Sequence, residues 1–336
     1  ISTNIMIVEK NSSINNSLGI SAKCKYLLIL KSENDFDELK DFLTNNNEKF
    51  YIVGEGTNLV LPNYYDGIII QANFDNLIED KTNNLLKVGA AYNWSKLVNF
   101  CISKNINGFE NLIDIPGSVG ASPIQNIGAY GAEVASLIES IDCYCLTDFK
   151  KINLANSECN FVYRNSSLKN SKRLIYNINF ITNKESDISI NYQTIKDYLK
   201  GNNIKANTTA DVANIISQIR SKALPNPNII NNVGSFFKNP IVDINSINFT
   251  NHLKEELIIW NYDEVQVKVG AARLIELIKN RVSIHKNVTL FENHSLVLVT
   301  NGQATQEDVL NYASEIQDLV YKTFNIKLEI EPNIIF

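Results

Sequence analysis

A long loop of small residues is the strongest chemical signal in this sequence. Residues 107–133 are rich in Gly, Pro, Asn and Ser and carry almost no charge. Gly117, Gly120 and Gly128, with the amide of Asn126, offer backbone N–H groups and small polar groups that suit the wrapping of a diphosphate. A loop this long in a compact domain is functional or disordered, and the interleaved Ile, Val and Phe residues argue against disorder. The alternative is a purely structural loop.

A second glycine-rich segment follows an apolar strand at 50–53. It reads Gly54-Glu55-Gly56-Thr57-Asn58 and could also approach a phosphate closely. It matches neither the dinucleotide fingerprint nor the P-loop. By itself it is more typical of a tight turn between strands. Taken with the later loop, it favours a nucleotide-cofactor site.

Three further positions carry groups suited to catalysis. Arg164, in Tyr163-Arg164-Asn165-Ser166, could grip a carboxylate or phosphate in a bidentate manner, or form a surface ion pair. Ser235 begins a run into two aromatic residues, which is also typical of a turn into a core strand; no nucleophile-elbow pattern surrounds it. Glu329 and Glu331 share one strand face and could do acid–base work or simply be solvated.

Alternating strand and helix patterns must position these groups. Asn93 is expected to cap a helix, and Thr208 with Asp211 resembles a capping box. Leu224-Pro225-Asn226-Pro227 breaks the chain and marks a domain boundary. The expected strands cover 26–30, 50–53, 67–71, 85–88, 137–146, 149–154, 174–182 and 328–331. The expected helices begin near Phe36, Trp94, Thr208, Ala271 and Thr305, and the one from Thr208 is expected to run through Ile219.

Composition excludes several classes of protein. The chain has 336 residues and a net charge of -5, which disfavours a nucleic-acid binder. No apolar run is long enough to span a membrane, and no secretory signal is visible near the N-terminus. The five cysteines and three histidines form no disulfide framework and no metal-ligand spacing. A cytoplasmic protein without a metal is expected.

Three segments in this order resemble the UDP-N-acetylenolpyruvoylglucosamine reductase (UDP-N-acetylmuramate dehydrogenase) family, in its longer form. They are Ile115–Gly131, Tyr163-Arg164 and Gly234–Pro240, within a similarity that runs from Asn16 to Glu331. The resemblance implies an α+β protein with a vanillyl-alcohol-oxidase-type FAD-binding fold of two subdomains and an α+β substrate-binding domain. The expected domains are 1–72 (FAD-binding subdomain 1), 73–223 with a returning strand at 325–336 (subdomain 2), and 224–324 (substrate-binding domain).

The family implies a reductase that holds FAD and uses NADPH as co-substrate. It would reduce the enolpyruvyl group of UDP-N-acetylglucosamine enolpyruvate to the lactyl ether of UDP-N-acetylmuramate, in peptidoglycan precursor synthesis. Hydride would come from flavin N5, and Arg164 would stabilise charge on the substrate carboxylate. Ser235 would donate the proton, helped by a relay or a cation such as Lys238, and Glu331 would lie beside the same group.

The same resemblance implies the binding residues. The FAD contacts would be Gly54, Glu55, Gly56, Thr57, Asn58, Pro116, Gly117, Gly120, Ala121, Ser122, Pro123, Asn126, Gly128 and Ala129. The substrate contacts would be Tyr192, Lys222, Asn239 and Lys268. The expected partners are the UDP-sugar and NADPH, with no nucleic acid and no membrane, and the chain is expected to be a monomer.

One position departs from the family pattern. Ala223 stands where a Lys usually precedes Leu-Pro, so Lys222 either replaces that contact with the diphosphate or the contact is lost. Two alternatives remain. Another oxidase or dehydrogenase on the same FAD fold would not need Arg164, Ser235 and Glu331 together. A non-catalytic flavin-binding protein would hold the cofactor without turnover.

Overall fold

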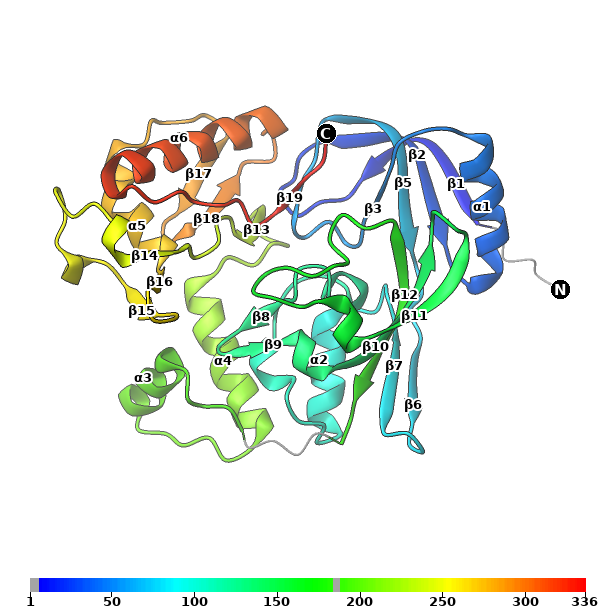
Figure 1. Cartoon of the computed structure of the whole chain (residues 1–336), viewed down its shortest axis with the longest axis horizontal. Coiled ribbons are helices and arrows are strands. Elements are labelled where there is room, and N and C mark those ends of the chain that lie inside the picture. The colour runs from blue at the N-terminus through cyan, green and yellow to red at the C-terminus, as the bar shows by residue number, and fades with distance from the viewer. Residues whose placement is uncertain (1–5, 184–187) are drawn as a thin grey trace. The chain divides into compact units, whose positions relative to one another are not determined.

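The chain forms two compact units whose segments alternate along the sequence. The computed structural model describes residues 6–183 and 188–336 (Figure 1). Unit 1 comprises the chain up to Ser12, Cys24–Glu55 and Asp66–Ser221; unit 2 comprises Ser13–Lys23, Gly56–Tyr65 and Lys222–Phe336. The domain limits drawn from the sequence, 1–72, 73–223 with 325–336, and 224–324, remain a prediction.

A four-stranded sheet and the helix α1 (Phe36–Asn45) form the first layer of unit 1. The strand order is β1 (Ile7–Ile14), β2 (Ala22–Leu30), β5 (Tyr64–Ala72) and β3 (Phe50–Ile52), with β3 parallel to β5. Phe36 and Leu39 of α1 are buried, in keeping with their helical spacing. The ring of Phe36 stacks on Tyr144 with centroids 4.2 Å apart, which ties this layer to the next sheet.

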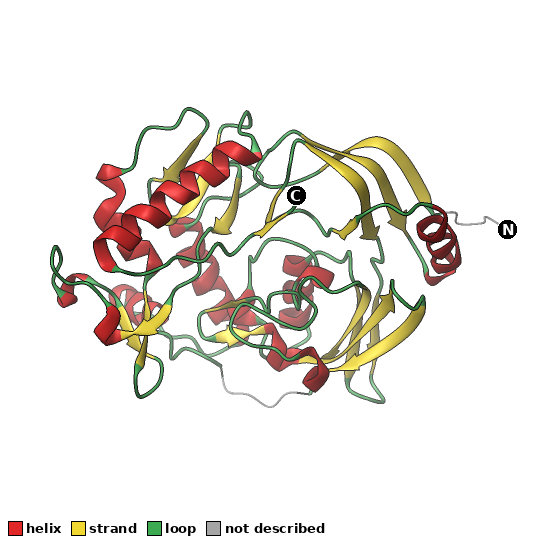
Figure 2. Ribbon diagram, turned by 45° about the horizontal axis from the view of Figure 1, so that its top comes forward, coloured by secondary structure: helices red, strands yellow, loops and turns green. Residues whose placement is uncertain are grey.

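The second sheet of unit 1 is antiparallel throughout. Its order is β11 (Lys150–Ala155), β10 (Ile138–Cys145), β12 (Arg173–Ile181), β7 (Leu85–Gly89) and β6 (Leu77–Asp80) (Figures 1 and 2). Buried residues of this sheet share one core with those of α2 (Trp94–Ser103), α3 (Gln193–Asn202) and α4 (Thr209–Ala223). Asn93 caps α2 by accepting the N–H of Lys96, as predicted.

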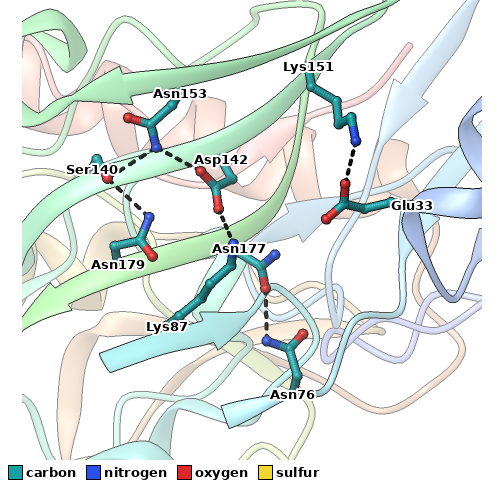
Figure 3. A network of polar contacts seen from close by, with 9 residues as sticks. All are labelled: Glu33, Asn76, Lys87, Ser140, Asp142, Lys151, Asn153, Asn177 and Asn179. Carbon is teal, nitrogen blue, oxygen red and sulfur yellow. Dashed lines mark hydrogen bonds and ion pairs between the residues drawn. The ribbon is translucent and has the colours of Figure 1, made fainter. Parts of the chain in front are cut away.

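A polar network crosses the strands of this sheet (Figure 3). Lys87 on β7 reaches Asp142 on β10 at 2.9 Å, so the pair spans the intervening strand β12. Asn153 donates to the same carboxylate at 2.7 Å, and Asn76 donates to Asn177 at 3.0 Å. Because Asp142 and Asn177 are buried, these bonds satisfy groups that would otherwise be costly to bury.

Unit 2 contains two three-stranded sheets and two helices. One sheet has the order β13 (Asn232–Ser235), β18 (His294–Thr300) and β17 (Val288–Phe291). This sheet contacts the helices α5 (Ala271–Ile278) and α6 (Gln306–Phe324). The other sheet has the order β14 (Ile241–Asp243), β16 (Gln266–Val269) and β15 (Ile259–Asn261). α6 is the long helix of Figure 2 and begins near the predicted position; Thr305 is its N-cap and accepts the N–H of Asp308 at 3.1 Å.

Two elements differ from the sequence prediction. α4 runs to Ala223 rather than ending near Ile219, because the first barrier to the helix is Pro225, which disfavours helical backbone at Leu224. The strand predicted at 328–331 is not regular: Ile330 bridges to Phe237, and a short strand β19 (Asn333–Ile334) follows and pairs in parallel with β4 (Leu59–Val60). No helix in the described part of the chain has the length and apolarity needed to span a bilayer.

Candidate functional site

The loop at 107–133 is a fixed framework within unit 1. Phe109, Leu112 and Val119 are fully buried, and the indole N–H of Trp94 donates to the carbonyl of Leu112 at 2.8 Å. Its ordered pieces are two short 3-10 turns, Glu110–Leu112 and Val119–Ala121, and a hairpin of β8 (Gly128–Ala129) and β9 (Ala132–Glu133). The loop can therefore present backbone donors at fixed positions.

The two glycine-rich segments meet in unit 1. A Cβ atom on Gly54 would lie 2.8 Å from the hydroxyl oxygen of Ser118, so glycine permits this close approach. Within residues 6–183 and 188–336, the backbone N–H groups of Gly54, Glu55, Gly117 and Ser118 donate to no acceptor. Gly117 also has a left-handed φ of 118° that favours glycine. Neighbouring N–H groups without protein acceptors suit an anion, and this donor set fits the diphosphate of FAD.

The rest of the segment 54–58 belongs to unit 2. Gly56 has a φ of 74°, and a Cβ there would lie 2.2 Å from the carbonyl oxygen of Asn15. The carbonyl of Asn58 accepts the N–H of Asn333 at 3.0 Å, and Thr57 lies between Gly56 and Asn58 in the chain. The predicted FAD contacts of this segment are thus divided between the two units.

Two predicted cofactor contacts are engaged inside the protein. The hydroxyl of Ser122 donates to the carbonyl of Val119 at 2.7 Å. The buried amide of Asn126 donates to Glu133 at 2.8 Å and accepts the N–H of Ala135 at 3.1 Å. These side chains shape the loop, so any contribution to cofactor binding is through its backbone.

Close packing explains why small residues occupy the other predicted positions of the loop. A Cβ on Gly120 would lie 2.6 Å from the Cβ of Ala90, and Gly120 donates its N–H to the carbonyl of Ala90 at 2.8 Å. Ala121 lies 3.5 Å from the position of a Gly54 Cβ. Pro116 is exposed at the entrance to this turn, whereas Pro123 is buried. The turn is therefore pressed against the end of β7.

Arg164 is anchored on the hairpin of the same loop. One guanidinium nitrogen, Nη2, donates to the carbonyl of Gly128 at 2.6 Å, and the other, Nη1, lies 2.8 Å from where a Gly128 Cβ would be. The group also lies over the ring of Tyr163, 5.2 Å from its centroid. Arg164 has a φ of 52°, which is rare for a long side chain and typical of positions strained for function. Ala129 continues the hairpin.

Tyr192 lies just before the first turn of α3 and is 42% exposed. Its ring meets the ring of Tyr130 edge to face, with centroids 5.6 Å apart. A half-exposed phenol beside the loop is available to an anionic ligand, which is the role that the sequence predicted for Tyr192.

Ser235 and Glu331 are brought together in unit 2 by backbone pairing. Ser235 ends β13, and the next residue, Phe236, accepts the N–H of Glu331 at 2.9 Å. The hydroxyl of Ser235 forms no hydrogen bond within the described residues. Gly234 has a φ of 73° and has open space where a side chain would be. The serine is half-buried, and Glu331 of the C-terminal segment pairs through its backbone with the residue that follows it.

Lys238 forms an ion pair with a carboxylate of the same C-terminal segment. Its Nζ lies 2.5 Å from Oε1 of Glu329, and the side chain of Lys238 is 13% exposed. The N–H of Lys238 also donates to the carbonyl of Glu329 at 2.9 Å. The positive neighbour that the sequence offered to Ser235 is therefore neutralised in part by Glu329.

The three other predicted substrate contacts lie at separate points of unit 2. Asn239 uses its side-chain oxygen to accept the N–H of Ala271 at 2.9 Å at the start of α5. Lys268 lies on β16 directly opposite Ile241 and Trp260. Lys222 is exposed in the last turn of α4.

Three residues near the site were not predicted from the sequence as site residues. Asn93, expected as a helix cap, also acts on Glu55: burial raises the pKa of the Glu55 carboxyl, and the side chain of Asn93 offsets part of that rise. Tyr130 lies beside Tyr192, and Nη2 of Arg220 donates to the carbonyl of Asp114 at 3.2 Å. The only signal for Arg220 was a charge within the amphipathic pattern of a helix.

Comparisons with known proteins agree with this geometry. Residues 24–145 match the family model of an FAD binding domain, and residues 225–335 match that of the UDP-N-acetylenolpyruvoylglucosamine reductase C-terminal domain. The UDP-N-acetylenolpyruvoylglucosamine reductase of Flavobacterium johnsoniae is 34% identical, over 98% of this chain and 100% of its own. That of Amoebophilus asiaticus is also 34% identical, over 95% of this chain and 96% of its own.

A solved structure has the same fold. The crystal structure of UDP-N-acetylenolpyruvylglucosamine reductase from Thermus caldophilus superimposes with a TM-score of 0.68 at 19% identity and covers 98% of this chain and 99% of that one. The α+β FAD-binding fold expected from the sequence is confirmed. The chain is matched over 98% of its length by a relative at 34% identity and in its C-terminal region by the model of this family, so it belongs to the UDP-N-acetylenolpyruvoylglucosamine reductase family.

Proposed function

We propose that this protein reduces UDP-N-acetylglucosamine enolpyruvate to UDP-N-acetylmuramate with NADPH, in peptidoglycan precursor synthesis. The observation that carries the proposal is that a whole-length relative at 34% identity is a reductase of this name. The chain also combines an FAD binding domain with the C-terminal domain of this reductase family. The other FAD-dependent activities considered from the sequence have no comparable support.

The FAD is held by the backbone of two segments. The N–H groups of Gly54, Glu55, Gly117 and Ser118 bind its diphosphate without a charged side chain. Bound FAD supplies a two-electron carrier that accepts hydride from NADPH and passes it to the vinyl CH2 of the substrate. The framework residues Ser122 and Asn126 hold the loop that provides these donors.

Arg164 binds the carboxylate of the enolpyruvyl group. An enol ether resists hydride attack, and it accepts hydride only if negative charge can spread onto its carboxylate. A guanidinium held on the carbonyl of Gly128 is preorganised to stabilise that charge. Because its fork is planar, it can bind both carboxylate oxygens.

Ser235 donates the proton to the carbon that bears the carboxylate. Its hydroxyl forms no hydrogen bond within the described residues, so it can turn towards the substrate. Glu331, whose N–H donates to the carbonyl of Phe236, orients the reacting group or returns a proton to Ser235 Oγ after the transfer.

The remaining predicted contacts bind the nucleotide part of the substrate. Tyr192 and the amide N–H groups of Asn239 donate to the diphosphate, and Lys268 supplies positive charge. Lys222 takes the place of the Lys that the family usually has at position 223. We also propose that the protein acts as a monomer in the cytoplasm, where its free thiols would stay reduced.

An anaerobic two-step experiment tests the function. NADPH should bleach the flavin absorbance of the purified protein, and UDP-N-acetylglucosamine enolpyruvate should then restore it promptly. A flavin that bleaches but is not reoxidised would leave another reductase on this fold as the better proposal. A flavin that never bleaches would favour a non-catalytic flavin-binding protein.

A further inference from the structure

The turn that carries Arg164 is tight and strained. Val162 and Asn165 exchange backbone hydrogen bonds of 3.0 and 3.1 Å, with only Tyr163 and Arg164 between them in the chain. Arg164 has the left-handed φ of 52°, at a turn position that favours glycine or asparagine. A long side chain keeps such a conformation only where the surrounding structure fixes it. The direction of the guanidinium therefore depends on the groups that hold residues 162–165.

A buried amide holds the start of this turn. The side-chain nitrogen of Asn126, which is fully buried, donates to the carbonyl of Val162 at 3.2 Å and to Oε2 of Glu133 at 2.8 Å. Glu133 pairs with Gly128 across the hairpin of β8 and β9, and the carbonyl of Gly128 accepts a hydrogen bond from Nη2 of Arg164 at 2.6 Å. Asn126 thus joins the backbone of the turn to the hairpin that holds its guanidinium.

A buried hydroxyl holds the end of the same turn. Ser166 is 6% exposed, and its hydroxyl donates to the carbonyl of Ile124 at 2.8 Å and accepts the N–H of Leu168 at 3.2 Å. Ile124 and Asn126 are two residues apart in the loop at 107–133, so both ends of the turn are fixed to the same stretch of that loop. Because the side chains of Asn126 and Ser166 are buried, water cannot readily replace either bond to the turn.

We propose that Asn126 and Ser166 are positioning residues, which clamp the turn of Arg164 onto the loop at 107–133 and so aim its guanidinium at the carboxylate of the substrate. This inference rests on the proposed function, in which Arg164 stabilises charge during hydride transfer to the substrate. Both side chains are bonded to protein groups, so they act through Arg164 and touch no reacting atom. Their removal should therefore slow reoxidation of the flavin by the UDP-sugar and leave its reduction by NADPH unaffected.

Stopped-flow absorbance of Ser166→Ala tests this clamp. Reoxidation of the reduced flavin by saturating UDP-N-acetylglucosamine enolpyruvate should slow about fivefold to tenfold, the change expected for loss of one buried hydrogen bond. Reduction by NADPH should stay within about twofold of the wild-type rate. In an Arg164→Met background, Ser166→Ala should slow reoxidation no further, because the group that it positions is absent. A merely structural role of Ser166 would not produce this dependence on Arg164.

Asn126→Asp is the second variant. The substitution keeps the size of the side chain and the oxygen that accepts the N–H of Ala135 at 3.1 Å, but it removes the donor to Val162 and Glu133. Reoxidation should slow at least as much as in Ser166→Ala, while reduction by NADPH stays near the wild-type rate.

The matched control is Ser167→Ala. The hydroxyl of Ser167 donates to the carbonyl of Glu158 at 3.1 Å, outside the loop at 107–133, so this variant should keep the wild-type rates. An unchanged reoxidation rate in folded Ser166→Ala, equal loss of both half-reactions, or full additivity with Arg164→Met would overturn the proposal. If Asn126→Asp does not fold, Ser166→Ala and its control decide the question. A wild-type flavin that NADPH reduces but this substrate does not reoxidise would instead refute the proposed function.

Discussion

Replacement of Gly128 by alanine should displace the guanidinium of Arg164, although Arg164 itself is left unchanged. The new Cβ would lie 2.8 Å from Nη1 of Arg164, 2.8 Å from the carbonyl oxygen of Ala132 and 3.0 Å from Cγ of Glu133. An ordinary contact of this kind begins at 3.4 Å, so the guanidinium must retreat by about 0.6 Å or more. A misplacement of about 1 Å can cost about a hundredfold in rate, so we expect reoxidation of the flavin by the UDP-sugar to slow about tenfold to a hundredfold.

Stopped-flow absorbance can separate the two half-reactions of Gly128→Ala. Reduction of the flavin by NADPH should stay near the wild-type rate, because the proposed role of Arg164 begins with the substrate carboxylate. The matched control is Gly201→Ala, since a Cβ at Gly201 meets no atom within 4 Å. If folded Gly128→Ala reoxidises at the wild-type rate, Arg164 is not the group that stabilises the substrate. Equal loss of both half-reactions would mean that Gly128 acts on the flavin instead.

Three further predictions concern the proton donor, the cation and a helix cap. Ser235→Ala should leave reduction by NADPH near normal and slow reoxidation about a hundredfold or more, as expected for loss of a general acid; equal loss of both rates in stopped flow would end the proton-donor role. Arg164→Lys keeps the charge but loses the planar fork, so reoxidation should slow about tenfold, and an unchanged rate would remove Arg164 from the mechanism. The N–H of Thr305 lowers the pKa of Asp308, so its carboxylate stabilises the fold above its ordinary pKa and loses that effect as the pH falls through the lowered value. Urea unfolding should therefore show Asp308→Asn to be less stable than wild type near neutral pH, with a difference that vanishes in acid; a difference that does not depend on pH would contradict the charge argument.

Features that depend on near neighbours in the chain could be predicted from the sequence. Asn93 caps its helix as expected, because a cap needs only a side chain and an N–H three residues later, and the helix predicted from Thr305 begins there. The alternation at 328–331 was misleading, since a strand also needs a partner, and within this segment only Ile330 bridges to Phe237.

The candidate site was predicted in outline by its residue types. Small residues in two segments predicted a diphosphate site, and the order of three motifs resembled one reductase family, which the comparisons confirm. The sequence could not show which groups of the loop remain available. Ser122 and Asn126 were predicted to contact the cofactor, yet both side chains form hydrogen bonds inside the protein. The backbone N–H groups of Gly54 and Ser118 form none within the described residues.

The sequence by itself determined the family, the helix caps and the chemical character of the two glycine-rich segments, because these depend on residue type and short spacing. Tertiary structure alone decided that the carbonyl of Gly128 holds Arg164, that the N–H of Glu331 pairs with the carbonyl of Phe236 directly after Ser235, and that Arg220 donates to the carbonyl of Asp114. Each of these contacts joins residues far apart in the chain. Their choice of partner depends on how whole strands and helices pack, and no local pattern encodes it.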